Sequence, residues 1–75
     1  LPTMPKYPRD LPGSAIIRAL QRMGFKVIFQ KGSHVRLRRE TSLVTVPRHK
    51  AVRVGTLAEI LRQADITLDE LREHL

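Results

Sequence analysis

The chain has 75 residues, of which 41% are hydrophobic and 28% charged, and it contains no cysteine. The length leaves room for one small globular domain and excludes a multidomain enzyme, while the lack of cysteine excludes a disulfide framework and any thiolate metal site. No apolar run approaches the roughly 18 residues that cross a bilayer and the start has no signal-peptide pattern, so we expect a cytoplasmic protein with no membrane partner.

The net charge of +7 arises from the middle of the chain. Residues 26–53 hold eight Lys and Arg and a single acid, Glu40, and eight minus one is seven. The remaining residues carry six cations and six acids, which cancel. Such a block concentrates positive potential where it can neutralise phosphates. The alternative interpretation is a solvated sheet face that arginine keeps soluble.

The beginning of the chain is expected to differ from the rest. We predict a flexible lead over residues 1–8 and one domain over residues 9–75. Met4 fits as the natural start, which would leave residues 1–3 as an added remnant.

The first predicted element is a helix over residues 11–23. Its apolar residues Ile16, Leu20 and Met23 recur at the helical spacing. Gly24 follows at the position where a helix often ends in a left-handed residue.

Three short strands are predicted next, because apolar and polar residues alternate over residues 25–30, 34–38 and 43–46. The turns between them are predicted as a three-residue loop over residues 31–33 and a four-residue loop over residues 39–42.

These loops define the expected register of the sheet. The first loop pairs Phe29 with Val35 and Val27 with Leu37, and a slip of one residue would move every side chain to the other face. The second loop gives the pairs Arg38–Leu43, Leu37–Val44, Val35–Val46 and His34–Pro47. The face expected to join the core holds Phe25, Val27, Phe29, Val35, Leu37, Val44 and Val46. The other face is basic and holds Lys26, Ile28, Gln30, His34, Arg36, Arg38, Leu43, Thr45 and Pro47.

Two further helices are predicted after Pro47, which ends the third strand. Residues 56–59 have the pattern of a capping box that opens a long helix, and residues 67–70 repeat that pattern before a short last helix. The residues expected to point inward are Leu57, Ile60, Leu61, Ala64, Leu68 and Leu71. The order predicts a two-layer α+β domain, in which both main helices cover one face of a three-stranded antiparallel sheet.

His34 is the main candidate for chemistry. It starts the second strand on the basic face, and histidine exchanges protons near neutral pH. The alternative interpretation is a polar surface residue. The chain has no P-loop, no HExxH and no GxSxG. Its three histidines lack the spacing of metal ligands, so we expect no metal.

Two weaker candidates follow the third strand. His49 comes two residues after Pro47, so it could lie at the same end of the sheet as His34 and act as a partner acid or base. The alternative is that His49 merely borders a loop. Residues 55–56 open the long helix beside a basic connection, which suggests a phosphate site, or equally an ordinary cap.

Five segments of the chain form a combination that is more specific than any one of them alone. In chain order they are Gly24-Phe25, Gln30-Lys31-Gly32-Ser33-His34, Thr45-Val46-Pro47-Arg48-His49, Gly55-Thr56-Leu57 and Ile60-Leu61-Arg62-Gln63-Ala64. Together these segments resemble the HicA toxin family, and the resemblance runs from about Ser14 to Leu71.

This resemblance implies a fold similar to the double-stranded RNA-binding domain. It also implies a toxin that cleaves messenger RNA without a metal or other cofactor, with His34 as the catalytic residue and a HicB-like antitoxin as partner. RNA carries its own nucleophile, the 2′-hydroxyl, so a base and charges that stabilise the phosphorane suffice for cleavage. The residues expected to contact RNA are Lys31, Ser33, Arg36, Arg38, Arg48, Lys50 and Arg53.

Two other functions remain open at this stage. A non-catalytic RNA-binding module would use the same basic face, but it would not require histidine at position 34. A DNA-binding regulator is disfavoured, because no helix carries a basic reading face; Arg18 and Arg22 alone are too few.

Overall fold

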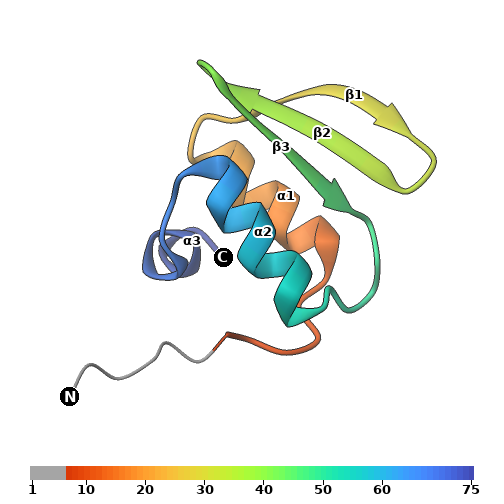
Figure 1. Ribbon diagram of the computed structural model, residues 1–75, viewed down its shortest axis with the longest axis vertical. Coiled ribbons are helices and arrows are strands. Elements are labelled where there is room, and N and C mark those ends of the chain that lie inside the picture. Colours follow the sequence, from red (N-terminus) through yellow and green to blue (C-terminus); the bar gives the residue numbers. More distant parts are fainter. Residues whose placement is uncertain (1–6) are drawn as a thin grey trace.

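The structure, a computed structural model, describes residues 7–75. It confirms the predicted order of elements and the α+β class (Figure 1). The three strands form one antiparallel sheet in the order β1-β2-β3. The elements are α1 (Gly13–Arg22), β1 (Lys26–Lys31), β2 (His34–Arg39), β3 (Ser42–Pro47), α2 (Val54–Ala64) and α3 (Leu68–Glu73).

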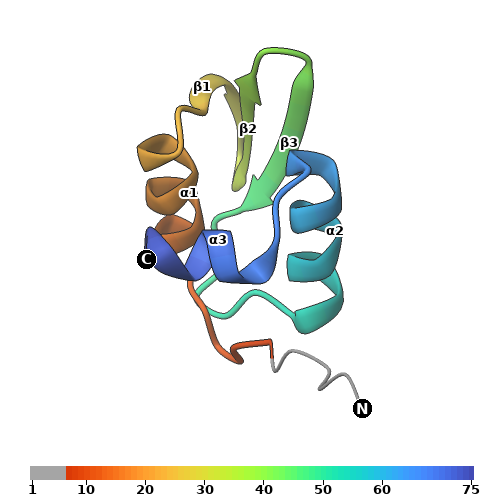
Figure 2. The same ribbon diagram turned by 90° about the vertical axis from the view of Figure 1, so that its left-hand side faces the viewer.

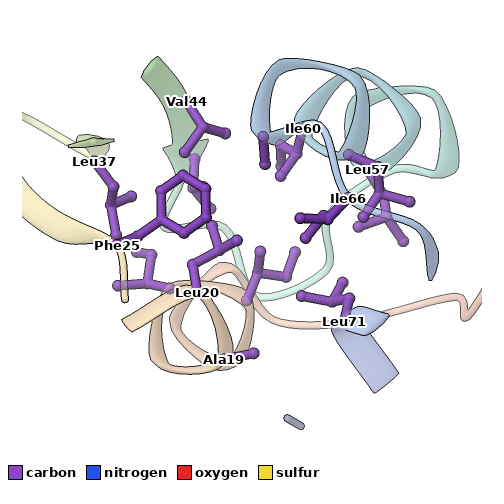
Figure 3. Close-up of a cluster of buried hydrophobic side chains, with 14 of the residues drawn as sticks. Ala19, Leu20, Phe25, Leu37, Val44, Leu57, Ile60, Ile66 and Leu71 are labelled. Carbon is purple, nitrogen blue, oxygen red and sulfur yellow. The ribbon is translucent and has the colours of Figure 1, made fainter. Parts of the chain in front are cut away.

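The helices form a second layer on one face of the sheet, with α3 at the end away from the strands, and Figure 2 shows α1 and α2 on opposite sides of α3 (Figures 1 and 2). The core lies between the layers, and Figure 3 shows Leu37 and Val44 of the sheet pointing toward Leu20 of α1. The inward-facing residues predicted for α2 and α3 are all buried, as are those of β2 and β3. Of the predicted lead, residues 1–6 lie outside the described residues, and Tyr7 packs against the core.

The first hairpin differs from the predicted register. Its turn has two residues, Gly32 and Ser33, and Gly32 has the positive φ of 57° that such a tight turn favours. Phe29 is therefore opposite Arg36 rather than Val35, so the predicted core position of Phe29 is wrong.

A β-bulge in β1 explains why the pairing is as predicted at Val27 but not at Phe29. The pairing of Val27 with Leu37 is as predicted, but the register shifts between Val27 and Phe29, which leaves Ile28 as an extra residue. Val27 thus stays on the face of Leu37 while Phe29 lies on the opposite face. Both are exposed, Val27 at 41% and Phe29 at 56%, because the helices leave β1 largely uncovered.

The second hairpin has the predicted pairing throughout. Its turn is shorter than predicted, because Arg39 also pairs with Ser42. Arg39 lies on the helical side of the sheet, where its guanidinium is 4.6 Å from the centre of the Phe25 ring and donates to the carbonyl of Met23 at 3.0 Å. It thereby satisfies a carbonyl at the end of α1.

The start of α2 also differs from the prediction. The helix begins at Val54 without a side-chain cap, so the predicted capping box at residues 56–59 is wrong. A tertiary contact defines this start, since the N–H of Val52 donates to the carbonyl of Leu11 at 2.8 Å just before the helix. The second predicted capping box, which joins Thr67 and Glu70 at the start of α3, is confirmed.

Candidate functional site

The outer face of the sheet is the surface opposite the helices. Along β2, His34, Arg36 and Arg38 are exposed on this face, whereas the alternating residues Val35 and Leu37 are fully buried. The alternation follows from the two-residue period of a strand. The predicted division of β2 into a core face and a basic face is therefore confirmed.

The strand pairing arranges the outer face in rows. Arg36 lies between Phe29 on β1 and Thr45 on β3, and in the next row His34 lies between Lys31 and Pro47. These rows surround a hollow of about 610 Å³. Its lining consists of Phe29, Lys31, Gly32, Ser33, His34, Arg36 and Thr45.

The cations of this face have no acidic partner among the described residues. Within residues 7–75, none of Lys31, Arg36 and Arg38 makes an ion pair, whereas Arg62 pairs with Glu59 on α2. Arg38 lies one row beyond the hollow. Its cross-strand neighbours in the sheet are Lys26 on β1 and Leu43 on β3. The face thus offers free cations around an exposed imidazole, an arrangement suited to a polyanion.

The connection after β3 begins beside the hollow. Arg48 donates its backbone N–H to the carbonyl of Ser33 at 2.6 Å, which ties the connection to the turn that precedes His34. The carbonyl of His49 then accepts from the N–H of Gly13 at 2.9 Å. The connection therefore turns from the sheet toward the start of α1.

Gly13 allows this close approach. A Cβ at this position would lie 1.8 Å from the carbonyl oxygen of Pro47, so only glycine lets the backbone of α1 pass there. The path of the connection is consequently determined by packing between α1 and the end of β3.

The remaining predicted residues do not line the hollow. His49 and Lys50 are exposed on the connection. Arg53 lines a separate hollow of about 440 Å³ at the start of α2, together with Arg9, Asp10, Ala51, Val52 and Val54. The structure thus brings Lys31, Ser33 and Arg36 together with His34, while His49 as an acid or base stays a prediction.

One lining residue was predicted on the opposite face of the sheet. Phe29 was placed in the core, although it faces the same hollow as His34. The signal was present in the run Val27-Ile28-Phe29, where three consecutive apolar residues break the alternation and indicate a bulge.

Two carboxylates on the helices have lowered pKa values. The backbone N–H of Thr67 and its hydroxyl, as partners of the Glu70 carboxylate, hold the pKa of Glu70 below its ordinary value. Arg62 likewise lowers the pKa of Glu59. Both carboxylates therefore stabilise helices, Glu70 in a capping box and Glu59 in a pair along α2.

Within residues 7–75, no three His, Cys, Asp or Glu side chains gather as a metal site.

Comparison with known proteins assigns the family. No curated protein matches the chain. In residues 7–75 no helix is long and apolar enough to span a bilayer. Residues 13–66 match the family model of the HicA toxin of bacterial toxin–antitoxin systems. This match extends from the start of α1 to just beyond α2 and includes the whole sheet and the hollow. The chain therefore belongs to the HicA toxin family.

Proposed function

We propose that this toxin is a metal-independent endoribonuclease that cleaves messenger RNA and uses His34 as its catalytic residue. The observation that supports it is the position of His34, exposed in a hollow of the outer face and bordered by Lys31 and Arg36. A base acting on RNA requires both access to the substrate and nearby positive charge, and this setting provides both.

The proposed reaction uses the nucleophile that RNA itself carries. His34 takes the proton of a 2′-hydroxyl, and that oxygen attacks the adjacent phosphorus. Arg36 and Lys31 stabilise the negative charge that develops on the phosphorane oxygens. The bond to the 5′-oxygen breaks, and this oxygen takes a proton from an acid. The products are a 2′,3′-cyclic phosphate and a 5′-hydroxyl. His49 is the candidate acid.

The RNA strand is proposed to follow the positive charge beyond the hollow. Arg38 continues the outer face along β2, and Arg48 begins the connection at the other end. Ser33 at the turn and the exposed Lys50 and Arg53 on the connection would contact neighbouring phosphates.

The decisive experiment compares two histidine variants on an RNA that the wild type cuts in the presence of a chelator. We expect His34→Ala to lower the cleavage rate by about a hundred- to ten-thousandfold, the usual effect of losing a positioned base. His74→Ala is the matched control, because His74 directly follows α3 and its ring contacts the carbonyl of Glu70 on that helix. His49→Ala should slow cleavage if His49 is the acid.

The cleavage assay also separates this proposal from passive RNA binding. Cleavage by folded His34→Ala at the wild-type rate would contradict the nuclease mechanism. Loss of wild-type cleavage in chelator would contradict metal independence.

We further propose that a HicB-like antitoxin with an acidic surface covers the outer face. Membership in a toxin–antitoxin family implies an antitoxin partner, and the uncompensated cations of this face favour rapid association with opposite charge. Modification of His34 by a histidine reagent should therefore be suppressed in the complex, while His74 still reacts. A complex in which cleavage is lost but His34 reacts as in the free toxin would point to inhibition from the helical side.

A further inference from the structure

The two phenylalanines of the chain have opposite environments. Phe25 is 2% exposed and contacts Arg39, whereas Phe29 is 56% exposed on the outer face. Exposure of an isolated apolar side chain is common on protein surfaces. Phe29 is distinguished by its position, because the bulge at Ile28 turns it toward the hollow instead of the core.

Phe29 lies close to the proposed reaction centre. Its direct cross-strand neighbour is Arg36, and His34 is the next outward residue along the same strand. His34 is therefore a diagonal neighbour of Phe29, at a Cα separation of roughly 7–8 Å that aromatic side chains bridge. Lys31 also borders the hollow, on the same strand as Phe29.

The combination of an exposed aromatic ring with neighbouring cations is typical of a site for an unpaired nucleotide. An unpaired base stacks on an aromatic ring while cations hold the phosphates on either side of it. Such a contact accepts any base, since every base has a π face. The bordering Lys31 and Arg36, which make no ion pair within residues 7–75, favour a phosphate-bearing ligand over an apolar protein surface.

We propose that Phe29 forms a stacking subsite for an unpaired base of single-stranded RNA. The base belongs to a nucleotide next to the cleaved bond, so that stacking on Phe29 holds the adjacent ribose over His34. Phe29 is then a positioning residue for the reaction, and the subsite rests on the proposed function.

Binding of single-stranded RNA should be measured in the His34→Ala background, which prevents cleavage. Phe29→Leu keeps an apolar side chain but removes the π face, and it should weaken binding roughly five- to hundredfold, the effect expected from losing one base-stacking contact. Phe29→Tyr should restore binding to within about twofold, because it keeps the ring. Leu43→Ala is the matched control, since Leu43 is 48% exposed on the outer face of β3 and should leave binding unchanged.

A fluorescence measurement tests stacking directly. The chain contains no tryptophan, so Phe29→Trp introduces a single indole at the subsite. A single-stranded RNA should quench its emission. An abasic strand of the same length, with the same phosphates and no bases, should bind more weakly and leave the emission nearly unchanged.

The outcomes separate this inference from the proposed function. If the wild type binds and cleaves RNA but Phe29→Leu binds equally well, the subsite is wrong and the nuclease stands. If Phe29→Leu weakens only the complex with the antitoxin, Phe29 contacts protein and the subsite is again wrong. If the wild type neither binds nor cleaves RNA, both proposals fail.

Discussion

The two faces of the sheet differ in almost every property, although their residues alternate along one strand. On the helical face, Val35 and Leu37 are fully buried in an apolar core. On the outer face, His34, Arg36 and Arg38 are exposed. Under the proposed function, stability and chemistry are separated residue by residue, so a change at one position should affect one property and leave the other intact.

The largest effect on stability is expected at the helical face. Leu37→Ala should lower the free energy of unfolding by about 2–5 kcal/mol, because it removes buried methyl groups and leaves a cavity. A small domain has a total of only about 5–15 kcal/mol. Urea unfolding would measure the loss, with the neighbouring Arg38→Ala as control, expected within about 0.5 kcal/mol of the wild type. Equal destabilisation by both variants would mean that the two faces are not separate.

A smaller effect is expected from the cations of the outer face. Arg36→Ala and Arg38→Ala should each weaken RNA binding across all sequences and reduce the slope of log affinity against log salt by about 0.7 to 1, the value of one phosphate contact. The measurement is a salt titration of binding. Arg18→Ala, a change of an exposed cation on α1, should leave the slope unchanged. A slope lowered by Arg18→Ala instead would place the RNA on the helices.

The smallest effect concerns the helical layer and depends on pH. The pKa of Glu70 is lowered in the folded protein from its ordinary value of 4.5, chiefly by the backbone N–H of Thr67. A carboxyl group whose pKa is lowered by folding stabilises the folded protein fully at a pH above its ordinary pKa. This contribution is lost as the pH falls through the pKa of the folded state. Glu70→Ala should therefore lower the urea midpoint at pH 7 and lower it less at pH 3. A penalty for Glu70→Ala that stays constant with pH would contradict this role of its charge.

The sequence predicts those parts of the fold in which local pattern and tertiary structure agree. The pairing of β2 with β3 was correct because β2 alternates strictly and its ladder with β3 has no bulge, and this places His34 and Arg36 on the outer face. The start of α2 was not predictable from its residues, because the contact of Leu11 with Val52 decides it. The position of His49 could not be predicted either, because the connection between β3 and α2 has no periodicity of its own.

The first hairpin shows how a strong local pattern can mislead. The apolar side chain of Phe29 was assigned to the core, and the shorter turn together with Ile28 reverses that assignment. Hydrophobicity alone does not distinguish a side chain that joins a core from one that stacks on a ligand. The candidate site was thus predicted in its charges and its histidine, but not in its aromatic surface.

The bulge at Ile28 also affects whether β1 can pair edge to edge with a second copy of the chain. The edge of β3 is partly covered, since the side chain of Gln63 accepts the N–H of Thr45 at 3.1 Å, whereas β1 is an open edge with exposed apolar residues. An open apolar edge is a template for aggregation. The bulge interrupts the regular ladder that a second copy would need, and the lysines at both ends of β1 would repel their counterparts. The same irregularity that turns an aromatic ring outward therefore disfavours edge-to-edge pairing of β1 with a second copy.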